Sequence, residues 1–260
     1  MEYIICRRKK AFIRKFALTI FTLGLSCSSI MNLNTISQAT ESDEIMSIKD
    51  NQYLSQSLPE GFVLVSDVVP DAIQEIRYYS TYNFVGERID AYKAPVAILS
   101  KEAAEALKKA SDDFISQGYY IKIFDAYRAQ SAVNHFIRWS QDKNDIKMKP
   151  FFYPDVNKED LFDLGYIVAK SSHSRGSTLD MTIVDAKTGK EVDTGSPFDL
   201  FDEVSHHDSN KITSVQRQNR EIIKATMERN GFNSYQTEWW HYTLRGEPYP
   251  DTYFDFPVGN

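Results

Sequence analysis

The chain contains 260 residues, with 36 acidic and 30 basic side chains, so its formal net charge is −6 at pH 7. An acidic surface repels phosphate groups, and we therefore expect no nucleic-acid partner. The two cysteines, Cys6 and Cys27, lie close to the N-terminus, which excludes thiolate metal sites, a cysteine nucleophile and a disulfide framework for the rest of the chain.

The N-terminus has the layout of a secretory signal. Basic residues gather at positions 7–15, an apolar run occupies 16–25, and a small-residue sequence stands at 37–39. We therefore expect residues 1–39 to be a secretion signal and the protein to be exported, either periplasmic or secreted. The alternative is a membrane anchor formed by the same segment, left uncleaved or lipidated. Its removal takes away six positive charges and one negative charge, so the formal charge changes from −6 to −11.

Composition divides the remainder of the chain into two parts. Residues 40–58 are polar and acidic without clear periodicity, which predicts a flexible lead-in. Residues 59–260 have the length and apolar content of one ordinary domain, and this is the expected catalytic domain.

The first half of that domain shows a helix, a strand and a second helix in succession. Residues 101–117 have apolar side chains at helical spacing, with Ser100 as the N-cap and Gly118 as the stop. Residues 119–124 alternate and are rich in β-formers, which predicts a strand. A second helix is expected over residues 131–140.

The second half predicts a strand pair, a helix and a terminal strand. Alternation around Leu179 indicates a strand that turns at 186–189 into a partner at 190–192. A helix is expected over 213–229 and the last strand over 237–244. Together these elements predict an α+β fold in which an antiparallel sheet carries a metal site and helices pack against the sheet.

Three good metal ligands lie in two short segments of the chain. His173 and Asp180 belong to Ser-Ser-His-Ser-Arg-Gly-Ser-Thr-Leu-Asp, and His241 ends Glu-Trp-Trp-His. Two imidazoles and one carboxylate fill three corners of a tetrahedron and leave the fourth for water, which is typical of catalytic zinc. Glu238, three residues before His241, is the expected base, since zinc lowers the pKa of a bound water from about 15.7 to roughly 7.

The spacing of Glu238 and His241 raises a geometric difficulty. Residues three apart on a regular strand face opposite sides of the sheet. Either Glu238 lies in the loop before the strand, or a bulge at Trp239 and Trp240 rotates one side chain inward. We expect the loop.

Ordinary structural roles also account for several other polar residues. Arg128 follows a predicted strand and is suited to stabilise an oxyanion, although spacing alone favours a pairing with a surface carboxylate. His206 and His207 lie in a polar stretch and are expected to be solvated. Gly176 permits a tight turn between His173 and Asp180.

Long sequence strings carry a family resemblance. The strings are Ser-Ser-His-Ser-Arg-Gly-Ser at 171–177, Phe-Asp at 198–199, Ser-His-His at 205–207, Glu-Trp-Trp-His-Tyr at 238–242 and Tyr-Phe-Asp-Phe-Pro at 253–257. With these, the chain from about residue 78 onward resembles the D-alanyl-D-alanine dipeptidases of the VanX type, within the zinc D-Ala-D-Ala peptidases.

The resemblance implies an activity and roles for named residues. It implies one zinc ion held by His173, Asp180 and His241, with catalysis by Glu238 and oxyanion stabilisation by Arg128. It also implies that Ser171 meets the carboxylate of a small dipeptide substrate and that Asp199 meets its amine.

The chain departs from the family at two points. The usual Asp-Gly-Tyr-Arg-Pro segment is Asp-Ala-Tyr-Arg-Ala here, and the loss of glycine and proline predicts a changed aim for Arg128. The expected export also puts in doubt a role in glycopeptide resistance, because the family members with that role act in the cytoplasm.

The expected reaction is therefore the zinc-dependent hydrolysis of D-Ala-D-Ala to free D-alanine. Two alternatives stay open. A trio of two histidines and one carboxylate also serves non-haem iron oxygenases. The second alternative is an exported cell-wall binding protein, retained on peptidoglycan, whose site is inactive.

Overall fold

The computed structural model describes residues 54–259, and the expected segments at 1–39 and, for the most part, 40–58 lie outside the described residues. A five-stranded sheet has the order β2-β4-β5-β7-β6. Its strands are β2 (Ile73–Gln74), β4 (Tyr119–Asp125), β5 (Thr178–Asp185), β7 (Glu238–Leu244) and β6 (Phe232–Tyr235). All neighbours in it are antiparallel except β2 and β4, which are parallel. The predicted α+β class with an antiparallel sheet is confirmed.

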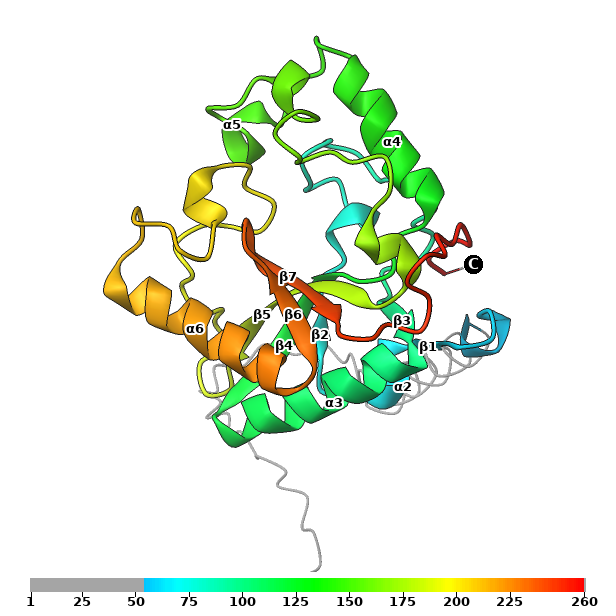
Figure 1. The fold of residues 1–260 in the computed structure, drawn as a ribbon, viewed down its shortest axis with the longest axis vertical. Coiled ribbons are helices and arrows are strands. Elements are labelled where there is room, and N and C mark those ends of the chain that lie inside the picture. The colour runs from blue at the N-terminus through cyan, green and yellow to red at the C-terminus, as the bar shows by residue number, and fades with distance from the viewer. Residues whose placement is uncertain (1–53, 260) are drawn as a thin grey trace, which may run out of the picture. The chain divides into compact units, whose positions relative to one another are not determined.

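Helices lie on both sides of this sheet (Figure 1). α3 (Lys101–Ser116) and α6 (Ser214–Arg229) pack on each other, α3 on β4 and α6 on β6. α4 (Gln130–Gln141) and α5 (Lys149–Phe152) lie on the opposite side. The remaining elements are short: β1 (Phe62–Leu64), α2 (Val65–Val68), η1 (Arg77–Tyr79), β3 (Ile98–Ser100), η2 (Lys158–Asp160), η3 (Ser172–Arg175) and η4 (Glu203–Ser205). β1 and β3 form a second, two-stranded antiparallel sheet.

The long helices begin and end where the sequence predicts. The Ser100 hydroxyl accepts a hydrogen bond from the Ala103 amide and caps α3, and Gly118 follows in the left-handed conformation at φ +89°. α6 starts with a capping box between Thr213 and Gln216. Both helices turn a buried apolar stripe toward the sheet, so local sequence and tertiary packing agree.

β5 is the central strand and is buried on both faces from Thr178 to Val184. Its alternation of apolar and polar residues separates the helix-packed face from the face that carries Asp180. The predicted turn after Asp185 is present, since the Asp185 amide donates to the Lys190 carbonyl. The predicted partner strand at 190–192 is reduced to one isolated bridge between Val184 and Glu191.

The C-terminal segment closes the core beside β1. The Phe62 ring contacts the rings of Tyr127, Tyr249, Phe254 and Phe256. The Tyr127 hydroxyl donates to the Phe256 carbonyl and accepts from the Phe256 amide, both at 2.9 Å. These bonds fix the backbone immediately before Arg128.

The predicted localisation, exported or anchored in the membrane, is corrected here. Within residues 54–259, no helix is both long enough and apolar enough to cross a bilayer. The basic and apolar segment on which the prediction depended lies at 1–39, outside the described residues.

His207 is buried, which contradicts the expectation of a solvated loop residue. Burial, followed by the charges of Lys224 and Arg220, lowers the pKa of His207 to about 4. The unfolded chain, with a pKa near 6.5, binds this proton more readily. We expect the free energy of unfolding to be intact above pH 6.5 and to fall by up to about 3 kcal/mol as the pH drops to 4.

Denaturant unfolding of the metal-free protein at pH 7 and pH 4.5 measures this effect. The same measurement on His207→Gln is the comparison, because that variant lacks the titrating ring. An equal loss of stability in both proteins between the two pH values would contradict the assignment.

Candidate metal centre and substrate pocket

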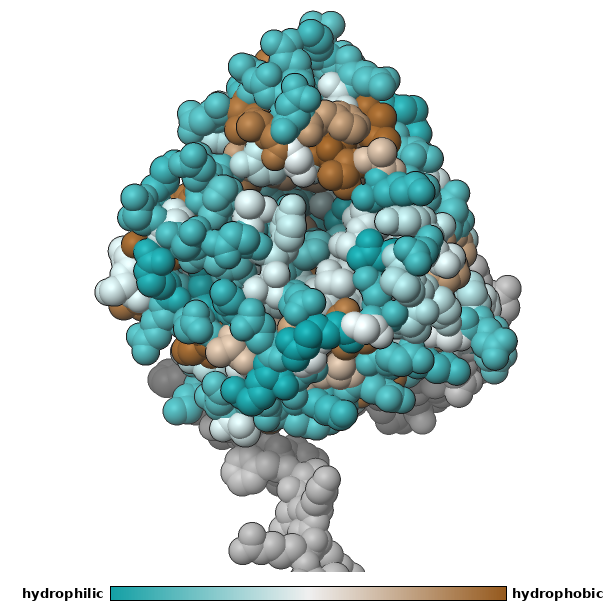
Figure 2. All heavy atoms as spheres, viewed as in Figure 1, coloured by the Kyte–Doolittle hydropathy of each residue, from teal (hydrophilic) through white to brown (hydrophobic). Residues whose placement is uncertain are grey.

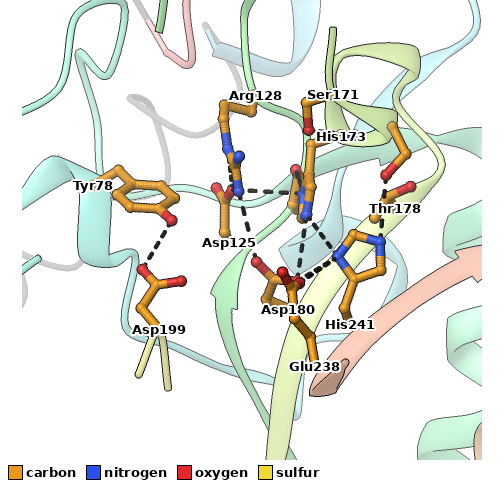
Figure 3. A network of polar contacts seen from close by, with 12 residues as sticks. Tyr78, Asp125, Arg128, Ser171, His173, Thr178, Asp180, Asp199, Glu238 and His241 are labelled. Atoms are coloured by element: carbon orange, nitrogen blue, oxygen red, sulfur yellow. Dashed lines mark hydrogen bonds and ion pairs between the residues drawn. The ribbon is translucent and has the colours of Figure 1, made fainter. Parts of the chain in front are cut away.

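Three elements bring the predicted ligands together in one place (Figure 3). His173 lies on η3, Asp180 on β5 and His241 on β7, directly across from Asp180 in the strand register. His173 Nε2 lies 3.3 Å from Asp180 Oδ1 and 3.3 Å from His241 Nδ1. His241 Nδ1 lies 3.2 Å from Asp180 Oδ1. The three donor atoms therefore form a nearly equilateral triangle.

The dimensions and donor chemistry of this triangle fit a metal ion. Ligand atoms 2.0–2.1 Å from a tetrahedral zinc ion are separated by roughly 3.3 Å. Asp180 Oδ1 is buried and accepts no hydrogen bond from the described residues. A buried carboxylate oxygen without a hydrogen bond is costly unless another group satisfies it, and an ion at the centre of the triangle would do so.

Neighbouring groups orient both imidazoles. His173 Nδ1 donates to the Ala126 carbonyl at 2.8 Å, so its Nε2 lone pair is left for the triangle. His241 presents Nδ1 to the triangle, and its Nε2 lies 3.3 Å from the Ser172 hydroxyl oxygen. The Ala126 carbonyl, which can only accept, fixes the His173 tautomer that a metal ligand requires, and the Ser172 hydroxyl helps to orient the His241 ring.

Charge in the site favours a cation. Burial raises the pKa of Asp180, but the imidazoles of His173 and His241 outweigh it and hold that pKa well below its usual range. Burial lowers the pKa of His241, yet the adjacent carboxylates of Asp180 and Glu238 raise it to about 9. The carboxylates thus stabilise positive charge at the position where a metal ion would bind.

A bulge, and not a loop, brings Glu238 to the same side as His241. Glu238 is the first residue of β7, which corrects the expected loop entry. Ser234 pairs with Tyr242 and the next residue, Tyr235, pairs with Glu238, so residues 239–241 of β7 stand between two consecutive residues of β6. Glu238 Oε2 consequently lies 3.4 Å from His241 Nδ1, beside the triangle.

Arg128 reaches the edge of the metal centre from the end of β4. Its Nε and Nη2 lie 2.9 and 2.8 Å from Asp125 Oδ2, and Nη2 lies 3.7 Å from Asp180 Oδ2. The guanidinium carbon lies 4.9 Å from the centroid of the Tyr78 ring and 5.3 Å from that of Phe136, and these two rings also contact each other. Arg128 is paired with buried carboxylates, whereas spacing alone had favoured a surface pair.

The two departures around Arg128 leave its backbone in place. Ala126 is not among the described residues with positive φ, so this position does not require glycine. Ala129 is the N-cap of α4 with φ −58°, close to the angle that proline would fix. The expected change in the aim of Arg128 has no basis in these backbone conformations.

Asp199 lies on the far side of the pocket from His241 (Figure 3). It has a left-handed backbone at φ +61°, and its Oδ2 accepts a hydrogen bond from the Tyr78 hydroxyl at 2.8 Å. Burial and the nearby charge of Asp180 raise the pKa of Asp199 well above its usual range. A positively charged ligand group would relieve this crowding of carboxylates.

A cavity of about 300 Å³ joins these groups. It is lined by both histidines, Asp180, Glu238, Arg128, Ser171 and Asp199, and by the rings of Tyr78, Phe84, Phe136, Phe201 and Tyr235. Figure 2 shows apolar surface gathered at the α4 and α5 end of the molecule. The volume of the cavity and the polar residues in its lining suit a small ligand with polar groups at both ends.

Gly176 holds the turn that separates His173 from Asp180. It ends η3 at φ +83°, and a Cβ atom placed there would lie 2.3 Å from Phe62 Cε1. We expect Gly176→Ala to lower the free energy of unfolding by about 2 kcal/mol or more, through strain and overlap. It should also weaken metal binding, because η3 must shift.

Thermal unfolding and metal titration measure the two effects. Gly189→Ala is the control, because Gly189 also has positive φ but no atom lies within 4 Å of its added Cβ. A Gly176→Ala protein no less stable than Gly189→Ala would contradict the role of the Phe62 contact.

The structure adds two residues that the sequence did not single out. Asp125 is fully buried, accepts from the Tyr92 hydroxyl at 2.5 Å and holds Arg128. The Tyr78 ring packs against the Arg128 guanidinium, and its hydroxyl donates a hydrogen bond to Asp199. Asp125 belongs to the Asp-Ala-Tyr-Arg segment that resembles the family's pattern, and that resemblance could have pointed to it. No sequence feature pointed to Tyr78.

Comparison with known proteins agrees with this geometry. Residues 59–259 match the family model Peptidase_M15, described as D-ala-D-ala dipeptidase. The D-alanyl-D-alanine dipeptidase of Enterococcus faecium is 40% identical over 198 residues, 76% of this chain and 98% of that protein. The enzyme of the same name from Streptomyces coelicolor is 39% identical over 197 residues, which is 76% of this chain and 98% of that protein. The one from Escherichia coli is 30% identical over 177 residues, which is 68% of this chain and 81% of that protein. The chain belongs to the Peptidase_M15 family of D-Ala-D-Ala dipeptidases and is a metallopeptidase.

Proposed function

We propose that this protein hydrolyses D-Ala-D-Ala to two molecules of D-alanine with one zinc ion held by His173, Asp180 and His241. The carrying observation is the triangle of three donor atoms 3.2–3.3 Å apart, with the Glu238 carboxylate beside it. The relatives named as D-alanyl-D-alanine dipeptidases over nearly their whole length support the substrate.

Glu238 is the proposed general base and then the general acid. When bound, zinc supplies a Lewis acid and lowers the pKa of a water molecule to roughly 7. Glu238 takes a proton from the attacking water while the oxygen of that water forms a bond to the carbonyl carbon of the peptide. The C–N bond then breaks, and Glu238 gives the proton to the leaving amine. Its side chain is a quarter exposed, which leaves room for water and substrate.

Arg128 is the proposed partner of the carbonyl oxygen as negative charge develops there. Asp125 holds the guanidinium through Nε and Nη2, and the rings of Tyr78 and Phe136 pack against it, so little reorganisation accompanies the reaction. Preorganised donors of this kind stabilise the transition state more than the bound substrate.

The two ends of the dipeptide are assigned to opposite ends of the pocket. Asp199, buried and bonded to Tyr78, is proposed to bind the free amine. Ser171 is proposed to bind the carboxylate; its oxygen accepts from the His173 amide, which leaves its hydroxyl hydrogen free to donate.

A dipeptide assay with metal analysis tests the proposal. The purified protein is offered D-Ala-D-Ala, L-Ala-L-Ala and a longer peptide ending in D-Ala-D-Ala, each with and without a chelator. We expect free D-alanine from the first, loss of activity with chelator, and recovery on adding zinc. Iron with 2-oxoglutarate dependence would indicate an oxygenase, and peptidoglycan retention without cleavage would indicate a binding protein; either result would overturn the proposal.

A further inference from the structure

One buried guanidinium closes the loop that carries Asp199. We call residues 194–206 the Asp199 loop. Arg220 of α6 is 1% exposed, and its Nε donates to the Thr194 carbonyl at 2.6 Å, near the start of the loop. Its Nη2 and Nη1 donate to the carbonyls of Val204 and His206 at 2.8 and 2.7 Å, near the end. Both ends of the loop are therefore held against one rigid fork.

Ser196, inside this loop, is a three-way junction. Its oxygen accepts from Trp239 Nε1 at 2.9 Å and from Arg220 Nη2 at 3.3 Å. It also lies 3.1 Å from the Ser205 hydroxyl, which donates to the Leu200 carbonyl at 2.7 Å. Because Ser205 has used its one hydrogen, Ser196 is the donor in the pair of hydroxyls. Ser196 thus accepts two hydrogen bonds and donates one.

Two arms of this junction end next to residues of the proposed mechanism. One arm reaches Trp239, which follows Glu238 in the bulge of β7. The other passes through Ser205 to Leu200, which follows Asp199. Asp199 has the left-handed φ of +61°, a conformation that its surroundings must hold. The hydrogen bond from Arg220 would be sufficient if the junction only joined α6 to the loop, but Ser196 also contacts the Trp239 and Ser205 side chains.

We propose that Ser196 is a positioning residue that sets the Asp199 carboxylate, the proposed amine anchor, against Glu238, the proposed base. This inference rests on the proposed function. A dipeptide fixed at its amine presents its carbonyl at one place, so the distance from anchor to base determines whether the water that Glu238 deprotonates can reach the carbonyl carbon. Displacement of either arm alters that distance without removing either carboxylate.

Each arm can be broken separately. Trp239→Phe removes the indole donor and keeps a ring, so we expect kcat for D-Ala-D-Ala to fall about 10-fold with KM within twofold. Ser205→Ala removes the link to Leu200, so we expect KM to rise about 10-fold with kcat within twofold. Ser196→Ala breaks both arms and should show both effects.

Conservative rescue and a matched control separate positioning from stability. Ser196→Thr keeps the hydroxyl, and a cavity of about 320 Å³ beside Ser196 and Trp239 has room for the methyl group, so we expect kcat and KM near those of the wild type. Ser140→Ala removes one hydroxyl bond of the same kind, to the Ile137 carbonyl on α4, and should leave both constants unchanged. Each protein is assayed after its zinc content and thermal unfolding are measured.

A substrate without the amine completes the test. Propionyl-D-alanine lacks the group that Asp199 is proposed to bind, so Ser205→Ala and wild type should have the same KM for it, while Trp239→Phe should still lower kcat. Two results would overturn the positioning role if the wild type cleaves D-Ala-D-Ala. The variants could change only in unfolding temperature, or kcat and KM could change without the expected separation between Trp239→Phe and Ser205→Ala. Wild type that does not cleave D-Ala-D-Ala would overturn the proposed function instead.

Discussion

Glu238→Gln is expected to lower kcat for D-Ala-D-Ala by roughly 10²- to 10⁴-fold while the protein keeps its zinc. Glutamine has the same shape but cannot accept and return the proton. The three proposed ligand atoms belong to other residues, and the Glu238 carboxylate lies at their edge, 3.4 Å from His241 Nδ1. Steady-state kinetics with metal analysis of the same preparation measures the separation of activity from metal binding.

The control for this substitution is Glu191→Gln. Glu191 is exposed, pairs with Lys122 and does not line the cavity at the metal centre, so its loss should leave kcat unchanged. Near-full hydrolysis by Glu238→Gln would remove Glu238 from the mechanism. Loss of zinc along with activity would make Glu238 a ligand.

Asp180→Asn is expected to abolish zinc retention and to lower activity at least as far as the Glu238 change. Asp180 is 2% exposed, and its Oδ1 is shared by both imidazoles at 3.2 and 3.3 Å. The amide removes the negative charge that favours a cation among these groups, and it leaves the two imidazoles as the remaining proposed ligands. Dialysis against a weak chelator, followed by metal analysis and assay, measures both losses.

Asp113→Asn is the matched control, because Asp113 pairs with Arg229 and Asn230 at the surface between α3 and α6. This variant should keep both metal and activity. An Asp180→Asn protein that still holds one zinc ion per chain would show that the carboxylate is not a ligand.

Local sequence was sufficient for the long elements and for the strand face on which Asp180 lies. The helix at 101–117 has a cap, an apolar stripe and a stop within its own residues, and the structure places α3 at Lys101–Ser116. The alternation around Leu179 predicts that Asp180 lies on the polar face of its strand, and the structure places it there. These features depend on neighbours within a few residues, which a sequence displays directly.

The bulge of β7 could not be read in the same way. The interval between Glu238 and His241 allowed a loop or a bulge, and the choice depends on pairing with both neighbouring strands. On one side Asp180 fixes His241, and on the other Tyr235 fixes Glu238, so the extra residues must project between them. This is a tertiary constraint that the isolated segment does not contain.

Long-range polar contacts were also beyond the sequence. Tyr78 and Asp199 are 121 positions apart, and Tyr92 and Asp125 are 33 positions apart, yet each pair shares a buried hydrogen bond. Burial was misjudged for His207 because its neighbours are polar, although Tyr242 and the loop before β7 enclose it. A residue's immediate neighbours do not show which distant segment will cover it.

Asp199 is a position at which the requirements of stability and of the proposed activity differ. Its backbone is in a conformation that glycine adopts more cheaply, and its carboxylate is buried near two other acidic groups. Heat tolerance by itself would favour replacing it with a smaller, uncharged side chain. The proposed role of Asp199 in binding the substrate amine would explain why an aspartate is kept at this position. Thermostabilisation of this protein should therefore begin at positions remote from that loop.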